Sequence, residues 1–336
     1  MEKICRRISE IGTVVGGGTP STKNPDYWGG DIPWISPKDL TDYKSVYISK
    51  GENFLTEKGL KSGTRLLPKN TLLFSSRAPI GYVALAANPI CTNQGFKSIV
   101  CDEKQVVPLY LYYYMKANLD YIKLFGTGAT FPEISGKTMG KIKVEIFKSL
   151  DVQHRIASIL STYDSLIENN TKRIRLLEKM AENLYKEWFV RFRFPGHENV
   201  EMENGLPKGW KRGSLSDVCE FKRGKNITSS EMQEGNVPVI SAGLEPSGYH
   251  SCSNVRGVNV TMSSSGANAG YIAIHYSDIW AADCSYIEES TTGNIYYVYE
   301  LLNNIRTVIN NFQRGAAQPH VYPKDVNLNS ATLLQI

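Results

Sequence analysis

Small polar and basic side chains gather in short segments rich in Gly, Ser and Asn in both halves of this 336-residue chain. Hydroxyl groups, side-chain amides, guanidinium groups and the backbone N–H groups that glycine leaves accessible are what proteins use to contact phosphates and base edges. Such segments are also ordinary turns, and for any single residue a solvated surface position is the competing interpretation. The candidates for nucleic-acid contacts are Lys38, Lys44, Ser76, Arg77, Asn93, Gln94, Thr127, Arg223, Lys225, Ser264, Asn268, Arg314 and Gln318.

Patterns that would indicate catalysis are absent or incomplete. The run Gly136–Thr138 resembles the end of a phosphate-binding loop, but Phe131 stands where that motif needs its first glycine. The run Gly16–Pro20 fails the dinucleotide pattern at its third glycine. The five histidines are dispersed, and the six cysteines include no CxxC pair. The sequence therefore predicts a chain without catalytic residues, without a metal site and without a cofactor of its own.

One long helix is predicted from about Val152 to Trp188, and it is the element that would position these segments. Apolar residues recur there at steps of four and three, and no Gly or Pro interrupts them. At about 1.5 Å per residue the helix would be a spacer of roughly 50 Å. An apolar stripe of this length favours coiled-coil pairing with a partner helix. The predicted pairing positions are Ile156, Leu160, Tyr163, Ile167, Asn170, Ile174, Leu177, Leu184 and Trp188. Asn170 either fixes the register of that pairing or is a partly exposed polar residue.

The pattern before this helix begins again after it. Four segments recur in order: Ile8–Ile11 as Leu215–Val218, Asp31–Ser36 as Asn236–Ser241, Ile80–Ala84 as Ala269–Ala273, and Phe125–Lys137 as Phe312–Lys324. Such self-similarity indicates a duplication. We predict an α+β fold of two duplicated β-rich domains joined by a long coiled-coil-type helix. The expected boundaries are 1–150 for the first domain, 151–194 for the helix, 195–209 for a linker and 210–336 for the second domain. Ile336 falls opposite Ser149, so the sequence contains one copy of the helix.

Composition and charge limit the classes of protein. Hydrophobic residues make up 41% and charged residues 21%, and no window approaches the roughly 18 apolar residues of a membrane span. We therefore expect a cytoplasmic protein with no membrane partner. The net charge is +5, and residues 1–150 hold 20 basic and 13 acidic side chains, against 18 and 20 in the remainder. An excess of this size permits a polyanionic partner without requiring one.

Three groups of residues resemble a known family. Gln153–Ser161, Tyr163–Asp164, Ile167–Asn169 and Lys179–Val190 closely resemble the central conserved region of type I restriction-modification specificity subunits. Gly16–Ser21 with Trp28–Ile35, and Leu206–Trp210, look like the same family. The resemblance implies two target-recognition domains, each of which reads one half of a split double-stranded DNA sequence. It also implies methyltransferase and restriction subunits as partners, with S-adenosylmethionine, ATP and magnesium bound by those partners.

The sequence departs from the family at one point, because members normally contain a second conserved helix that packs antiparallel on the first. A homodimer, a separate C-terminal specificity fragment or a methyltransferase helix could complete the pair. An alternative hypothesis is that the chain is a truncated or rearranged specificity protein that acts only as an assembly module. An enzyme active by itself is the third hypothesis, and it predicts activity of the purified chain without partners.

Overall fold

Two compact units make up the computed structural model, Met1–Arg173 and Ile174–Ile336. The structure describes residues 2–77, 79–128, 130, 132–315 and 318–328. The boundary between the units falls within one continuous helix, α6, which spans Leu150–Tyr185. The helix expected over residues 152–188 is therefore present, and it continues into a π-helical turn at Lys186–Val190. Among the described residues, none of the helices has both the length and the apolar character of a membrane-spanning segment.

Unit 1 is built on a five-stranded sheet in the order β2-β9-β6-β7-β4. A second sheet has the order β5-β3-β8, and β1 pairs with β10. The strands are β1 Lys3–Arg7, β2 Gly12–Gly16, β3 Trp28–Ile35, β4 Tyr47–Ile48, β5 Asn53–Leu55, β6 Leu72–Ser76, β7 Ile80–Ala86, β8 Cys91–Thr92, β9 Lys97–Cys101 and β10 Lys143–Phe147.

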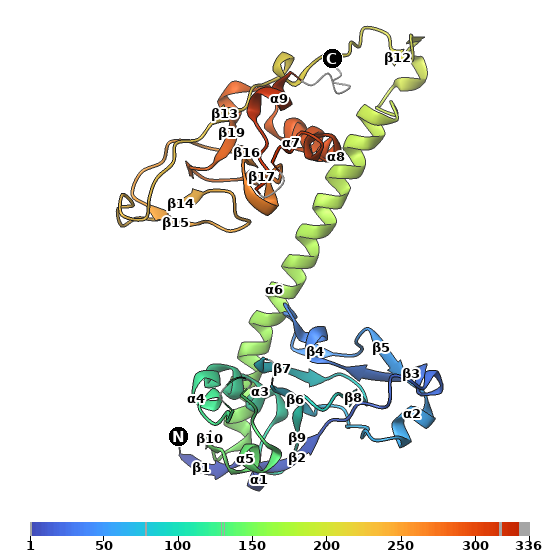
Figure 1. Ribbon diagram of the computed structural model, residues 1–336, viewed down its shortest axis with the longest axis vertical. Coiled ribbons are helices and arrows are strands. Elements are labelled where there is room, and N and C mark those ends of the chain that lie inside the picture. The colour runs from blue at the N-terminus through green and yellow to red at the C-terminus, as the bar shows by residue number, and fades with distance from the viewer. Residues whose placement is uncertain (1, 78, 129, 131, 316–317, 329–336) are drawn as a thin grey trace. The chain divides into compact units, whose positions relative to one another are not determined.

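The helices of unit 1 enclose its core. They are α1 Ile8–Ile11, α2 Glu57–Lys61, α3 Pro108–Ala117, α4 Leu119–Lys123 and α5 Gly136–Lys141, with 3-10 turns η1 Pro25–Tyr27 and η2 Pro37–Leu40. Buried side chains of β6, including Leu72 and Phe74, pack with Leu111 and Met115 of α3. Figure 1 shows α3 beside β6 and β7. Helices α3 and α4 meet at Asn118, whose side chain donates to the Tyr114 carbonyl at 2.9 Å.

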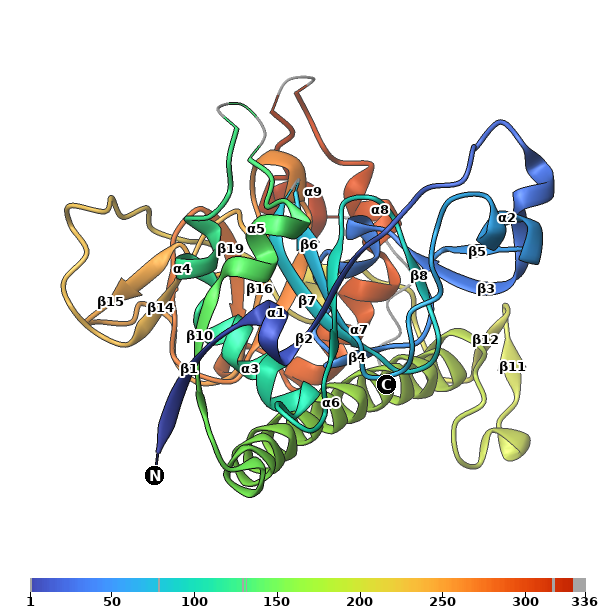
Figure 2. The same cartoon turned by 90° about the horizontal axis from the view of Figure 1, so that it is seen from below.

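Unit 2 repeats this plan with fewer strands. Its main sheet has the order β13-β19-β16-β17, and its second sheet the order β15-β14-β18. The strands are β11 Met202–Glu203, β12 Leu206–Pro207, β13 Lys222–Arg223, β14 Val237–Ile240, β15 Gly248–His250, β16 Asn259–Ser263, β17 Ile272–His275, β18 Trp280–Ala281 and β19 Cys284–Glu288. The pair β14 and β15 lies to one side of the main sheet (Figure 2). The helices are α7 Ile295–Asn304, α8 Arg306–Asn310 and α9 Pro323–Asn327.

The pairing of the smaller sheets confirms the duplication. In unit 1, β3 pairs antiparallel with β5 and parallel with β8. In unit 2, β14 pairs antiparallel with β15 and parallel with β18. Because a mixed pairing of this kind requires the same chain path in both units, the sequence repeats correspond to a repeated fold. The fold class expected from the sequence is therefore confirmed.

Candidate nucleic-acid interface

Three loops of unit 1 meet beside the ends of β6 and β9. They are the β6–β7 turn, the segment before β9 and the loop before α5, and each holds residues that the sequence singled out. Their backbones are joined directly, because the Ser76 N–H donates to the Gly95 carbonyl at 2.7 Å and the Ile134 N–H donates to the Ser76 carbonyl at 2.9 Å. The Asn93 side chain closes the middle loop by accepting from the Gly95 N–H at 2.8 Å.

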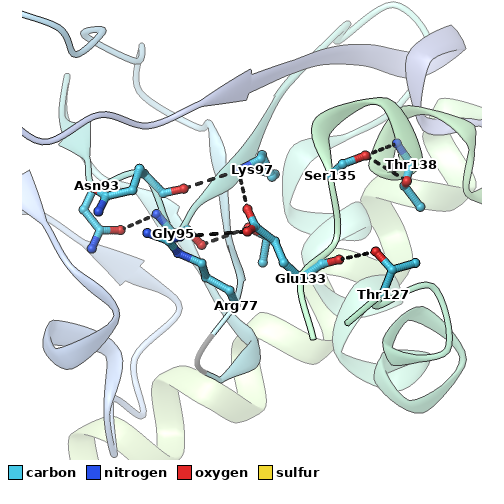
Figure 3. Close-up of polar contacts among 10 residues, drawn as sticks. Arg77, Asn93, Gly95, Lys97, Thr127, Glu133, Ser135 and Thr138 are labelled. Atoms are coloured by element: carbon cyan, nitrogen blue, oxygen red, sulfur yellow. Dashed lines mark hydrogen bonds and ion pairs between the residues drawn. The ribbon is translucent and has the colours of Figure 1, made fainter. Parts of the chain in front are cut away.

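Charged side chains converge on Glu133 at this junction. Its carboxylate lies 3.2 Å from Lys97 Nζ and 3.8 Å from a guanidinium nitrogen of Arg77 (Figure 3). Lys97 also donates to the Gln94 carbonyl at 3.3 Å. The Arg77 side chain is 39% exposed and the Lys97 side chain 16%, so the guanidinium group is the more accessible of the two cations. We call Arg77, Gln94, Lys97, Thr127 and Glu133 the unit 1 cluster.

The corresponding loops of unit 2 are assembled by equivalent backbone hydrogen bonds. In unit 1, Thr127 and Glu133 exchange two N–H to carbonyl bonds, of 3.0 and 2.9 Å, and in unit 2 Arg314 and His320 do the same at 2.9 and 2.8 Å. Four more backbone hydrogen bonds of unit 1 have an equivalent in unit 2. Written from the N–H donor to the carbonyl acceptor, with the unit 1 bond first, they are Gly17–Phe96 and Gly224–Cys284; Gly18–Thr92 and Lys225–Ala281; Asn93–Ile35 and Ala282–Ile240; and Ile134–Ser76 and Val321–Ser264.

Two equivalent glycines show why the frame is specified in the sequence. A side-chain carbon added at Gly17 would lie 2.0 Å from the Asn93 carbonyl oxygen, and one added at Gly224 would lie 2.4 Å from the Ala282 carbonyl oxygen. Both distances are far inside van der Waals contact, so only glycine fits where the backbone, just after β2 or β13, passes the neighbouring loop. The repeated Gly therefore preserves the same close backbone approach in both units.

The charges on this shared frame differ between the units. In unit 2, Arg223 pairs with Asp283 at 2.9 Å, and the same carboxylate accepts a hydrogen bond from Ser265. Arg314 pairs with Asp325 at 2.8 Å and its side chain is 67% exposed. Unit 2 thus offers two paired arginines where unit 1 offers Arg77 and Lys97 around one carboxylate. We call Arg223, Ser265, Asp283, Arg314 and Asp325 the unit 2 cluster.

The remaining candidates fall into two groups. Ser76 and Ser264 are fully buried: Ser76 Oγ donates to the Gly95 carbonyl and Ser264 Oγ lies 3.5 Å from Ser285 Oγ. Their position corrects the expectation of a surface contact, since here both hold loops together. The others are wholly or partly accessible and include Lys38, Lys44, Asn93, Lys225, Asn268 and Gln318.

Several accessible candidates already have partners. Lys38 forms an ion pair with Glu52 at 2.9 Å, and hydrogen bonding to that carboxylate raises the pKa of Lys38. The Asn268 side chain donates to the Ala242 carbonyl at 3.4 Å. Lys225 contributes backbone contacts, since its carbonyl accepts from the Trp280 indole at 2.8 Å. The assignment of individual nucleic-acid contacts stays a prediction. Residues 78, 129, 131, 316 and 317 of the predicted loops lie outside the described residues.

Sequence reasoning missed Lys97, Glu133, Ser265, Asp283 and Asp325. No local motif marks them, because their partners lie between 11 and 60 residues away along the chain. The alignment of the two repeats could have found Glu133, because it places Glu133 opposite His320 and Thr127 opposite Arg314, and each of these pairs closes a loop. The described residues contain no group of three or more His, Cys, Asp or Glu side chains arranged to hold a metal ion.

The long helix is anchored to unit 1 at its start. Gln153 is fully buried, accepts from the Val107 N–H at 2.8 Å and donates to the Phe147 carbonyl at 2.7 Å. Tyr113 donates to Asp164 at 2.6 Å. Near the other end, Tyr185 is buried in the core of unit 2 and packs against Tyr297.

Most of the predicted pairing positions of α6 remain accessible to solvent. Leu160, Tyr163, Ile167, Ile174, Leu177 and Leu184 are 39 to 63% exposed, and Ile159, Leu166, Leu176 and Met180 beside them are 52 to 65% exposed. Asn170 is exposed, whereas Ile156 and Trp188 are partly buried. An exposed apolar stripe of this kind is typical of a surface that binds a partner. The pairing itself stays a prediction.

Comparison with known proteins gives consistent matches. The family model described as the type I restriction modification DNA specificity domain matches residues 3–179 and 207–327. The MjaIX specificity subunit of Methanocaldococcus jannaschii is 45% identical over 241 residues, covering 70% of this chain and 55% of that protein. The EcoR124I/EcoR124II specificity subunit of Escherichia coli is 31% identical, covering 58% of this chain and 49% of that protein. The chain thus spans about half the length of these relatives.

A solved structure shares the fold. The type I restriction-modification S subunit from M. genitalium superposes with a TM-score of 0.64 at 18% identity, covering 93% of this chain and 79% of that one. At this identity the match supports the fold alone. The roles of single residues are argued from the geometry of the two clusters.

Proposed function

The chain belongs to the type I restriction modification DNA specificity family, and we propose that it reads a bipartite DNA target, one half with each unit. One observation carries this proposal: the two units present their clusters on one backbone frame, and the charged groups on that frame differ. A shared frame with different side chains suits two domains that bind DNA in the same way and read different bases.

In this proposal each cluster supplies one exposed arginine to the DNA. Arg77 and Arg314 are both accessible, and each lies beside a carboxylate: Glu133 at 3.8 Å from Arg77, and Asp325 at 2.8 Å from Arg314. A guanidinium group can form two parallel hydrogen bonds to guanine O6 and N7 in the major groove. The other accessible candidates would contact phosphates or neighbouring base edges. They are Lys38, Lys44, Asn93, Gln94, Thr127, Arg223, Lys225, Asn268 and Gln318.

Helix α6 would then set the separation of the two half-sites. Its 36 residues correspond to about 54 Å at 1.5 Å per residue, about one and a half turns of B-DNA. We expect its exposed apolar face to pair with another helix, supplied by a second copy, a separate specificity fragment or a methyltransferase subunit. Methylation and cleavage would belong to methyltransferase and restriction subunits, with S-adenosylmethionine, ATP and magnesium bound there, and this chain would hold no cofactor.

Methylome sequencing of cells with and without the chain, in the presence of its methyltransferase, tests the proposal. The expected result is a modified motif with two specified parts separated by unspecified bases, present only when the chain is expressed. A chain that serves assembly alone would add no motif, and a motif with one specified part would contradict reading by both units.

A further inference from the structure

Strand β4 of unit 1 has no counterpart in the described part of unit 2. The segment 36–52, between β3 and β5, forms η2 and β4, whereas the equivalent segment 241–247, between β14 and β15, forms neither. The main sheet of unit 1 consequently ends in β4, and that of unit 2 ends in β17, the equivalent of β7. Strand β17 is therefore an edge strand where its counterpart is covered.

The covering strand in unit 1 satisfies two backbone groups. Leu85 N–H donates to the Val46 carbonyl at 2.8 Å, and Ala87 N–H donates to the Ile48 carbonyl at 2.9 Å. The register of the β16–β17 pair makes Ile274 and Tyr276 the equivalents of Leu85 and Ala87.

Ladder geometry directs the same groups of unit 2 toward the open edge. Ser263 N–H donates to the Tyr271 carbonyl at 2.9 Å, so Tyr271 directs its backbone groups toward β16. In an antiparallel ladder every second residue does so, which on β17 means Ala273 and His275, while the residues between them direct their groups to the other side. The N–H groups of Ile274 and Tyr276 therefore point away from β16. Unpaired edge groups of this kind are a template for another strand.

A cavity of about 190 Å³ lies beside this edge, on the face of β17 that carries Ala273 and His275. The equivalent face of unit 1 is filled by its own residues, because Ala84 and Ala86 pack there against Leu40 of η2 and Ile48 of β4. The missing segment thus removes both a strand and the side chains that fill the space under it.

The walls of the cavity are more polar than those of the unit 1 core. Thr261 stands where unit 1 has Leu73, and its hydroxyl lies 2.9 Å from Nε2 of His275, which stands where unit 1 has Ala86. Burial lowers the pKa of His275, which favours the neutral imidazole. A cavity with these walls suits a hydrogen-bonding side chain better than the isoleucine of β4.

We propose that β17 and this cavity form a docking site for an extended segment of a partner polypeptide. The segment adds as a parallel strand, accepts hydrogen bonds from the N–H groups of Ile274 and Tyr276, and places one amide or hydroxyl side chain in the cavity. Strand β4 shows in the same molecule what occupies this place: a short extended segment in parallel pairing with β7. Recognition by strand addition uses backbone bonds for affinity and a side-chain pocket for selectivity.

A synthetic peptide provides the probe. It has the sequence of residues 44–50 with the change Ile48→Gln, and it is titrated to millimolar concentration into the full chain labelled with ¹⁵N at isoleucine and tyrosine. The amide resonances of Ile274 and Tyr276 should shift and saturate. The unchanged sequence of residues 44–50 should bind several-fold more weakly, because it places isoleucine against Thr261 and His275.

Tyr276 offers a matched pair of variants, since its side chain is 70% exposed and its N–H faces the open edge. Tyr276→Pro removes that N–H at an edge position where proline is tolerated, and Tyr276→Ala keeps it. We expect at least tenfold weaker peptide binding for Tyr276→Pro, read at the Ile274 amide, and a change below twofold for Tyr276→Ala.

The proposal is overturned if neither amide responds at millimolar peptide, or if the two variants bind the peptide equally. It is also overturned if the wild-type chain does not bind the peptide and Tyr276→Pro, but not Tyr276→Ala, weakens DNA binding. The cavity would then bind a nucleotide. Unchanged remaining resonances in Tyr276→Pro show that the fold is retained.

Discussion

Thr127 and Arg314 occupy the same position in the two copies of the fold. Each exchanges two backbone hydrogen bonds with the residue that closes its loop, Glu133 in one case and His320 in the other. One position therefore presents a hydroxyl group in unit 1 and a guanidinium group in unit 2. This difference on a common frame is the basis for assigning separate half-sites to the two units.

Substitution of the accessible arginines tests their assignment as base-reading residues. Arg77→Ala should relax the preference at one base pair by about 1 to 3 kcal/mol, because a bidentate guanidinium contact to guanine is lost. Fluorescence anisotropy with the modified motif and its single-base variants measures the effect. Lys148→Ala is the control, since Lys148 pairs with Glu2 outside the cluster and should leave all affinities unchanged. Equal weakening on every sequence would identify Arg77 as a phosphate contact.

Glu133 balances the charge of Arg77 and Lys97, so Glu133→Gln should strengthen binding to all DNA sequences. Removal of the carboxylate leaves Arg77 and Lys97 without their shared partner, so both can contact phosphates. For each phosphate that a protein neutralises, the logarithm of the binding constant falls by about 0.9 more per tenfold increase in salt concentration. We expect a steeper salt dependence and a smaller ratio of specific to non-specific affinity. Glu145→Gln, which alters an ion pair with Lys3 elsewhere in unit 1, should change neither.

Gln153 should be a stability determinant of unit 1. Gln153→Ala leaves the buried Val107 N–H and Phe147 carbonyl without partners, at a cost of about 1 to 3 kcal/mol in the free energy of unfolding. Urea denaturation followed by circular dichroism measures the change. His154→Ala removes an exposed neighbour on the same helix turn and should have little effect. Equal unfolding midpoints for the two variants would show that water replaces the lost contacts.

The apolar face of α6 should be needed for association. Ile167 and Leu177 are 61% and 60% exposed, so Ile167→Glu and Leu177→Glu should not destabilise the isolated chain. Light scattering of the purified chain, alone and mixed with a type I methyltransferase subunit, should show the wild-type chain in a species above 37.6 kDa in at least one case. The variants should give 37.6 kDa in both. An unchanged assembly would place the partner contact on another surface.

The stability of unit 2 should depend on pH because of Glu300. Burial, followed by the carboxylates of Glu182 and Glu178, raises the pKa of Glu300 above 4.5. The folded state therefore binds this proton more tightly, and stability falls as the pH rises from about 4.5 through the raised value. Glu300→Gln should unfold at higher urea concentration than wild type at pH 7 and at the same concentration near pH 4. Glu289→Gln, at an exposed position, should follow the wild type at every pH.

The sequence predicted the elements whose evidence is local. Steps of four and three residues gave α6, and repeated segments such as Ile80–Ala84 and Ala269–Ala273 gave the duplication. The clusters were only partly predictable, because Glu133 lies far along the chain from Arg77 and no short pattern joins them. Ser76 ends strand β6 and Ser264 directly follows β16, and both are buried. A sequence does not tell which side of such a junction faces the core. The absence of a β4 equivalent from the described part of unit 2 was not foreseen, since short edge strands carry little periodic signal.

Binding-site selection from random DNA, performed with the assembled complex containing wild type, Arg77→Ala or Arg314→Ala, tests the central proposal most directly. The wild type should select a motif with two specified halves. Arg77→Ala should lose information in one half and Arg314→Ala in the other, with the spacing unchanged. Loss in the same half for both variants, or in neither half for either variant, would contradict the assignment of one half-site to each unit.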